Sequence, residues 1–108
     1  MASQSSLSHQ KIVNSMPVGV LTIEIQIPWA HSLKDKRAVL LKIRDRLRNR
    51  FNVAVAELDH TDLWQQATIG VAAISSSRQI LDQVLRRVLA ESERVLGSDV
   101  QDYDIEIF

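Results

Sequence analysis

Residues 32–52, SLKDKRAVLLKIRDRLRNRFN, are the stretch that decides the fold, because they predict one long amphipathic helix. Ser32 can cap the first turn, and Asp35, three residues later, is the acidic partner of a capping box. At about 100° per residue, one broad arc collects the apolar side chains Leu33, Val39, Leu40, Ile43, Leu47 and Phe51. Such an arc is typical of a helix packed on a core. Asn52 follows the last apolar position, and we expect it to end the helix in the left-handed conformation.

Positive charge sets this helix apart from the rest of the chain. Within residues 34–50, eight basic residues face two acidic ones, a local net charge of +6 in a chain whose net charge is zero. Spacings of seven and four place three arginines along one flank of the helix. The candidate RNA or phosphate contacts are these arginines and two lysines near the helix start, namely Lys34, Lys36, Arg37, Arg44 and Arg48. The alternative is a solvated helix face, which charge runs of this kind also form.

The composition indicates one small domain. The chain has 108 residues, of which 45% are hydrophobic, and this is enough for a single core. It contains no Cys, which excludes disulfides and thiolate chemistry. No stretch approaches the ~20 apolar residues of a membrane span, and the amino terminus lacks the apolar region of a secretory signal. We therefore expect a cytoplasmic protein without a membrane partner.

The zero net charge limits the nucleic-acid interpretation. A domain that binds nucleic acid with its whole surface is usually strongly basic, and this chain is not. Any such binding has to come from the basic helix, and no sequence-specific DNA binding is expected.

The remaining segments alternate between strand and helix patterns. Residues 1–15 are polar and serine-rich and predict a disordered leader before a single domain over residues 16–108. Strands are expected over residues 18–27, 53–58, 67–74 and 100–108. Ser76 with Gln79 forms a second capping box, which opens a second helix that Gly97 closes. Gly70, inside the third strand, predicts the close approach of another part of the chain.

The resulting order is β-α-β-β-α-β. For about 90 residues, the economical arrangement is an α+β, ferredoxin-like sandwich, in which two helices cover one face of a four-stranded antiparallel sheet. Right-handed crossovers place the strands in the spatial order 4-1-3-2. This order brings Trp29, His31 and residues 59–62 to the end of the sheet where the basic helix begins.

The loops at that end carry a polar cluster. Its members are His31, Asp59, His60 and Asp62. Their spacing matches no metal motif, so no metal, cofactor or catalytic residue is expected, and turn formation with loop hydrogen bonding is their expected use. An alternative is a small-anion site, in which the first amides of the helix act together with His31, Lys34 and Lys36. Trp29 and Trp64 are expected to pack within the fold, with stacking on a base as the alternative.

The uncovered face of the sheet is expected to be acidic. Alternation puts on it the side chains of Thr22, Glu24, Gln26, Asp102, Asp104 and Glu106. An RNA-recognition-motif use of this face is disfavoured, because it requires stacking aromatic residues. If Glu57 shares this face, then Val53 and Val55 share it too. The three would form a partly apolar strip at which a second copy or another protein could bind.

Several separated motifs are similar to those of one bacterial family. They are HSLKDKR at residues 31–37, RLRNRFNV at 46–53, AELDH at 56–60, DLWQQA at 62–67 and GVA at 70–72. In these motifs the chain resembles the YlxP-like family, domain of unknown function 503, over residues 16–108. The resemblance implies a ferredoxin-like fold. It also implies genes that often lie among those for transcription elongation, translation initiation and ribosome maturation factors, with no established activity.

These features lead to one functional expectation and two alternatives. We expect a non-enzymatic accessory protein that contacts RNA or the ribosome through the basic helix. The first alternative is a protein-interaction or homodimerisation module that uses the open sheet face. The second is a small-anion-binding regulatory domain.

Overall fold

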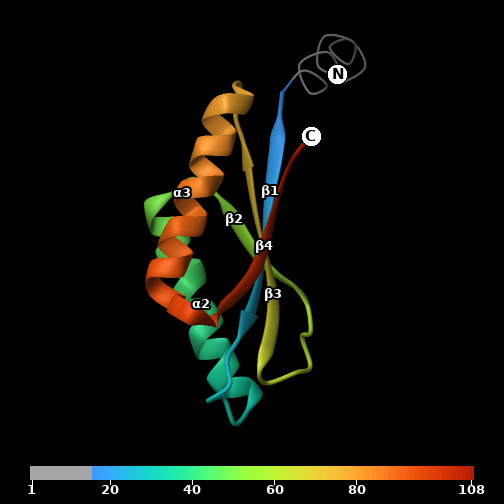
Figure 1. The fold of residues 1–108 in the computed structure, drawn as a ribbon, viewed down its shortest axis with the longest axis vertical. Helices are drawn as coiled ribbons and strands as arrows, with labels where there is room; N and C mark the ends of the chain where they lie inside the picture. Colours follow the sequence, from blue (N-terminus) through green and yellow to red (C-terminus); the bar gives the residue numbers. More distant parts are fainter. Residues whose placement is uncertain (1–15) are drawn as a thin grey trace, which may run out of the picture.

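The computed structural model describes residues 16–108, so the leader predicted over residues 1–15 lies outside the described residues. The elements are β1 (Val18–Gln26), α2 (Leu33–Arg50), β2 (Ala54–Asp59), β3 (Gln66–Ile74), α3 (Arg78–Leu96), a 3-10 turn (Gly97–Asp99) and β4 (Val100–Ile107). The strands lie in the order β2-β3-β1-β4, every neighbouring pair is antiparallel, and both helices lie on one side of the sheet (Figure 1). The predicted α+β sandwich is confirmed, since the order 4-1-3-2 is this order read from the other edge.

Helix α2 begins as the sequence predicts but ends differently. The Ser32 Oγ accepts a hydrogen bond from the Asp35 amide at 3.1 Å, which caps the first turn. At the other end, Phe51 is extended, with φ at −134°, and its amide donates to the Leu47 carbonyl at 2.8 Å. The prediction of a left-handed Asn52 is wrong, because the chain passes directly from the helix into an extended segment.

His60, with φ at 61°, is the one non-glycine residue with positive φ in the described part of the chain.

Helix α3 is capped one residue later than predicted. The Ser77 Oγ, in place of the Ser76 side chain, accepts from the Ile80 amide at 3.2 Å. The Ser75 hydroxyl accepts from the Ser77 amide, which turns the chain before the helix starts. Gly97, with φ at 59°, ends the helix as predicted.

The core lies between the sheet and the two helices. Alternate side chains of β1 and β3 face the helices and are fully buried, Leu21, Ile23, Ile25, Ile69 and Val71 among them. They pack against a helix layer that includes Ile43, Leu47, Leu81, Leu85 and Val88. Each such side chain contributes about 1.5–3 kcal/mol when it is taken out of water. Burial of this apolar layer fixes which side of each strand is inside.

The register of β2 corrects the predicted interface strip. Cross-strand partners point to the same face of a sheet, and Val55 pairs with the buried Val71 while Glu57 pairs with the buried Ile69. Val53, two residues earlier, packs against the core as well. The placement of Val53, Val55 and Glu57 on the open face is therefore wrong, and all three belong to the helix side.

The open face carries the other half of β2 and the expected acidic residues. Ala54 and Ala56 pair with Ala72 and Gly70 of β3, on the side away from the helices. A Cβ at Gly70 would lie 2.6 Å from the Cδ1 of Leu58, which confirms the predicted close approach. On β4, the residues that share this face are Asp102, Asp104 and Glu106, opposite Glu24, Thr22 and Val20. Neither described helix is long and apolar enough to cross a lipid bilayer.

Candidate functional site

Positive charge is confined to the helix layer of the described structure. Helix α2 carries eight Lys or Arg residues against two acidic ones, and α3 carries four against three, so the helices have a net charge of +7. The other described residues hold eight acidic side chains and no Lys or Arg, a net charge of −8. The domain is therefore two-sided in charge, with basic helices on an acidic sheet and loops.

Three arginines of α2, here called the arginine stripe, are the candidate phosphate contacts. Arg37 and Arg44 lie on the flank of the helix that faces β2, and their spacing to Arg48 places it on the same flank. Arg37 and Arg48 are exposed, and Arg44 is half-buried. Among the described residues, Arg44 pairs with Asp45 at 3.5 Å between Nε and Oδ1, while Arg37 and Arg48 make no ion pair. Guanidinium groups of the stripe are therefore available to an external anion.

The opposite flank of α2 uses its arginines to hold α3. Glu91 of α3 is 8% exposed, and its Oε2 accepts from the Arg46 Nε at 2.7 Å, the Arg50 Nη1 at 3.3 Å and the Arg94 Nη2 at 2.7 Å. The hydrogen bonds from Arg94 and Arg46 lower the pKa of Glu91 from 4.5 to about 2, against the opposing effect of burial. Arg46 and Arg50 thus join the two helices.

Lys36 is not available to an outside ligand. Its side chain is 1% exposed, and its Nζ lies 2.9 Å from the Glu57 Oε2, 2.7 Å from the His60 carbonyl oxygen and 3.2 Å from that of Gln66. The prediction of Lys36 as a phosphate contact is wrong. Lys36 stands seven residues before Ile43, so it lies in the apolar arc of the helix, and it fastens the β2–β3 loop to α2.

The start of α2 already holds a carboxylate of its own. The His31 amide donates to the Asp35 Oδ2 at 2.9 Å, and the Asp35 amide is taken by Ser32. Lys34 and His31 are exposed there. Because the Asp35 carboxylate lies in the first turn of α2 and already takes the His31 amide, its negative charge opposes an external anion there, and the geometry offers little to the small-anion alternative.

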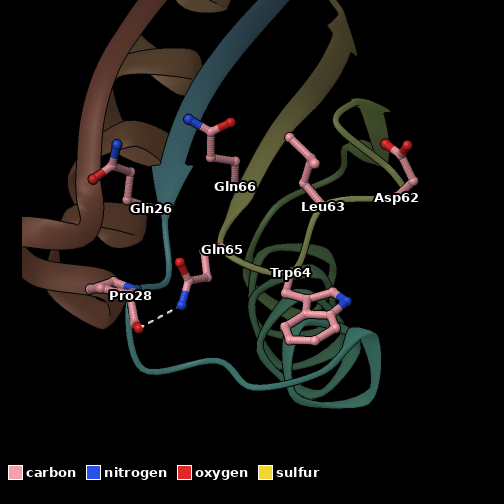
Figure 2. A pocket seen from close by; sticks show the side chains of 7 residues that line it. All are labelled: Gln26, Pro28, Asp62, Leu63, Trp64, Gln65 and Gln66. Atoms are coloured by element: carbon pink, nitrogen blue, oxygen red, sulfur yellow. Dashed lines mark hydrogen bonds between the residues drawn. The ribbon is translucent and has the colours of Figure 1, made fainter.

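The β2–β3 loop is also fastened to the β1–α2 turn. The Gln65 side-chain amide donates to the carbonyl oxygen of Pro28 at 3.0 Å (Figure 2) and to that of Ala30 at 3.1 Å. The Ile27 amide donates to the Gln65 carbonyl at 2.9 Å. The loop is therefore held by Lys36 on one side and by Gln65 on the other.

In the polar cluster of the loops, Asp59 and His60 make hydrogen bonds within the turn that follows β2. The Asp59 Oδ1 accepts from the His60 amide at 2.7 Å, and the His60 carbonyl accepts from the Leu63 amide and from Lys36. Asp62 is an exposed residue of the same loop. Within residues 16–108, no three His, Asp or Glu side chains come together in a way that suits a metal ion.

A hollow of about 450 Å³ lies beside this loop at the end of the sheet. Gln26 and Gln66, cross-strand partners on β1 and β3, lie on one side of it, and Trp64 projects from the loop (Figure 2). Trp64 is 51% exposed and Trp29 is 54% exposed, so the expectation that both pack within the fold is wrong. Hydrogen bonds hold their loops, which leaves the indole rings accessible. An accessible indole can stack on a base.

A second hollow, here called the α2–β2 groove, runs between the helix and the edge strand and has a volume of about 380 Å³. Its lining comes from α2, β2 and β3: Arg37, Leu40, Leu41, Arg44, Val55, Ala56, Glu57 and Ile69. Two residues of the predicted interface strip, Val55 and Glu57, therefore meet two arginines of the stripe. The sequence pattern alone predicts these as separate surfaces, on opposite faces of the sheet.

Residues 18–105 match the family model described as "Protein of unknown function (DUF503)". The chain belongs to the DUF503 family. One relative of this DUF503 protein is "Uncharacterized protein YlxP" of Bacillus subtilis (strain 168), which is 47% identical over 73 residues, or 68% of this chain and 79% of that protein. The predicted family membership is thus confirmed.

Two solved structures share the fold of this DUF503 protein. The de novo designed protein Foldit4 has a TM-score of 0.55 at 13% identity and is matched over 86% of this chain and 96% of its own. The de novo designed protein Ferredog-Diesel has a TM-score of 0.50 at 16% identity, over 82% of this chain and 83% of its own. At these identities the likeness extends to the fold alone.

Sequence reasoning missed the α2–β2 groove. Leu40 was assigned only to the core, and Ile69 only to a strand. A signal was present, because Lys36 falls in the apolar arc of its helix and a buried lysine requires a carboxylate nearby. Glu57, at an alternate position of a short strand, was available for that pair, and the pairing would have placed β2 with its Val55 side toward α2.

Proposed function

We propose that this DUF503 protein is a non-enzymatic accessory protein of the cytoplasm that contacts single-stranded RNA, free or within the ribosome, through the arginine stripe. The observation that carries the proposal is the one-sided placement of positive charge: all twelve described Lys and Arg residues belong to the two helices. A one-sided cationic surface attracts a polyanion although the whole chain is neutral.

The stripe is the part of this surface that suits phosphates best. Arg46 and Arg50 are committed to Glu91, whereas Arg37 and Arg48 are exposed and make no ion pair with the described residues. Arginine holds phosphate oxygens with two parallel hydrogen bonds. The genes that the family resemblance places nearby, for translation initiation and ribosome maturation factors, agree with such a partner.

Trp64 favours a single strand over a duplex. Its indole is half exposed in a fastened loop, at the end of the domain where α2 begins. Stacking of an unpaired base on an aromatic ring contributes about 1–3 kcal/mol, and bases inside a duplex cannot take part in it. A strand that follows the stripe toward the start of α2 therefore approaches the Trp64 loop.

The test measures affinity for a labelled single-stranded RNA and co-sedimentation with ribosomal subunits at several salt concentrations. Changing Arg37, Arg44 and Arg48 together to Glu is expected to abolish binding without unfolding the domain. The matched control changes the same three to Lys, which keeps the charge and is expected to keep most of the affinity. Changing them to Gln is expected to reduce the slope of log affinity against log salt by about 2. Retained binding in the Glu variant would refute the proposal.

A further inference from the structure

The edge strand β2 has an open backbone. In the order β2-β3-β1-β4 it is outermost, so one side of its backbone has no partner among the described strands. Natural edge strands are usually protected by Pro, Lys or other charged residues. The other edge, β4, carries Asp102, Asp104 and Glu106, whereas the first three residues of β2 are Ala54, Val55 and Ala56. The charged residues of β2, Glu57 and Asp59, lie in its second half, so its first half is the edge segment that can accept another strand.

Side chains of such a strand could contact the residues that line the α2–β2 groove. A strand added beside β2 would point every second side chain toward α2, where Leu40, Val55 and Ile69 line the groove. Leu41, on the helix side of the groove, is 49% exposed. An apolar side chain from the added strand would cover this exposed leucine.

The charge along the groove selects acidic neighbours for that apolar side chain. Arg37 and Arg44 line the groove on either side of Leu41, and the one acidic lining residue, Glu57, is already paired with Lys36. The Nε of Arg44 is enclosed, and its 3.5 Å contact with the Asp45 Oδ1 is not a hydrogen bond, so this donor has no hydrogen-bond partner in the described part of the chain. The groove therefore offers two cations, one with an unused donor, around an apolar centre.

The spacing of Arg37 and Arg44 predicts a sequence pattern for the bound strand. Seven residues of helix separate Arg37 and Arg44 by about 10.5 Å, and positions i and i+4 of a strand lie about 13 Å apart. The length of the arginine side chains accommodates the difference. Acidic residues at i and i+4 would therefore meet the two arginines, and an apolar residue at i+2 would meet Leu41.

We propose that the α2–β2 groove binds an extended segment of a partner protein with the pattern acidic-x-apolar-x-acidic, whose backbone extends the sheet at β2. This mode is strand addition, in which main-chain hydrogen bonds give affinity and alternate side chains give specificity. It goes beyond the RNA proposal, with which it shares Arg37 and Arg44, because nucleic acid has no amide backbone to pair with an edge strand.

The first test uses the unchanged protein and the end-blocked, fluorescent peptide TETVTET. Two further peptides carry N-methyl groups on alternate amides, one on each edge of the strand. Because an added strand pairs through one edge only, one methylated peptide is expected to bind as the parent does and the other about tenfold or more weakly. Equal binding of both methylated peptides, equal binding of the apolar-free peptide TETTTET, or no binding of the parent would overturn the proposal.

The second test separates this groove from the RNA surface. The double variant Leu41→Asn with Val55→Thr removes apolar contacts without changing charge, and its fold is checked by circular dichroism. It is expected to lose about tenfold or more in peptide affinity and to keep its RNA affinity, whereas the control Lys42→Gln, on the other flank of α2, keeps both. If the double variant loses RNA affinity and keeps peptide affinity, the groove belongs to the nucleic-acid surface and the strand-addition proposal is wrong.

Discussion

Lys36→Met is expected to destabilise the domain by about 3 kcal/mol. Met keeps most of the apolar stem, so the change removes the ammonium group and leaves the core packed. The lost contacts are those of Nζ with the carbonyl oxygens of His60 and Gln66 and with the carboxylate of Glu57. A hydrogen bond to a charged group contributes about 1.5–3 kcal/mol. The lower value applies to both carbonyls here, because His60 lies in the loop after β2 and Gln66 is the exposed first residue of β3, where water can reach.

The ion pair with Glu57 adds less than a fully buried pair would. The Glu57 side chain is 24% exposed, so its carboxylate regains water when Lys36 is removed. For a domain of this size, about 3 kcal/mol corresponds to a fall in melting temperature of about 12–24 °C. The loss of stability is expected to lower the urea midpoint and to speed hydrogen exchange in the loop that follows β2.

The assay compares urea unfolding of Lys36→Met with that of Lys34→Met, followed by circular dichroism and tryptophan fluorescence. Lys34 is an exposed lysine in the same turn of α2, and its loss is expected to change stability by no more than about 0.5 kcal/mol. A double-mutant cycle with Glu57→Gln isolates the ion pair. If the two lysine variants have equal stability, Lys36 does not fasten the loop, and the reasoning from its contacts is refuted.

Three further predictions test the packing, the electrostatics and the capping. Gly70→Ala is expected to cost about 1 kcal/mol, because its Cβ would lie 2.6 Å from the Leu58 Cδ1. Adding Leu58→Ala removes most of this penalty, and an unchanged penalty in chemical denaturation would contradict the contact. Because the pKa of Glu91 is lowered from 4.5 to about 2, its contribution to stability is fully present above pH 4.5 and is lost as the pH falls through about 2. Urea midpoints of Glu91→Gln are therefore expected to fall less with acid than those of the unchanged protein, and parallel curves would argue against this role. Ser77→Ala is expected to lower the free energy of unfolding by about 1 kcal/mol, and Ser76→Ala by much less, as measured by thermal unfolding. The reason is that Ser77 caps α3. A larger loss in Ser76→Ala than in Ser77→Ala would favour Ser76 as the cap, as the sequence predicts.

The secondary structure could be predicted because it depends on local periodicity. Apolar residues at every second position identified β1 and β4, and the arc that includes Ile43 and Leu47 identified α2. Capping is also local, and Ser32 was found directly. Ser76 was misassigned because three consecutive serines, residues 75–77, offer the same side chain at each position, and only the backbone geometry distinguishes them.

The sequence also located one candidate surface correctly in outline. Arg37, Arg44 and Arg48 share a flank of α2 because helix geometry alone fixes their relative directions. Their role as RNA contacts stays a prediction. Helix geometry does not identify the strand that lies beside this flank.

Tertiary structure decided the face of β2 and the use of Lys36. The segment VAVAEL alternates Val with Ala, and both are apolar enough for either face, so its pattern does not fix an orientation. The register with β3 does, since Val55 must lie beside the buried Val71. In the sequence, Lys36 is one of eight basic residues of the helix, and its partner Glu57 lies 21 positions away. The sequence by itself therefore determined the elements and their order, which depend on neighbours along the chain. The groove and its buried ion pair depend on neighbours in space, which only the packed structure supplies.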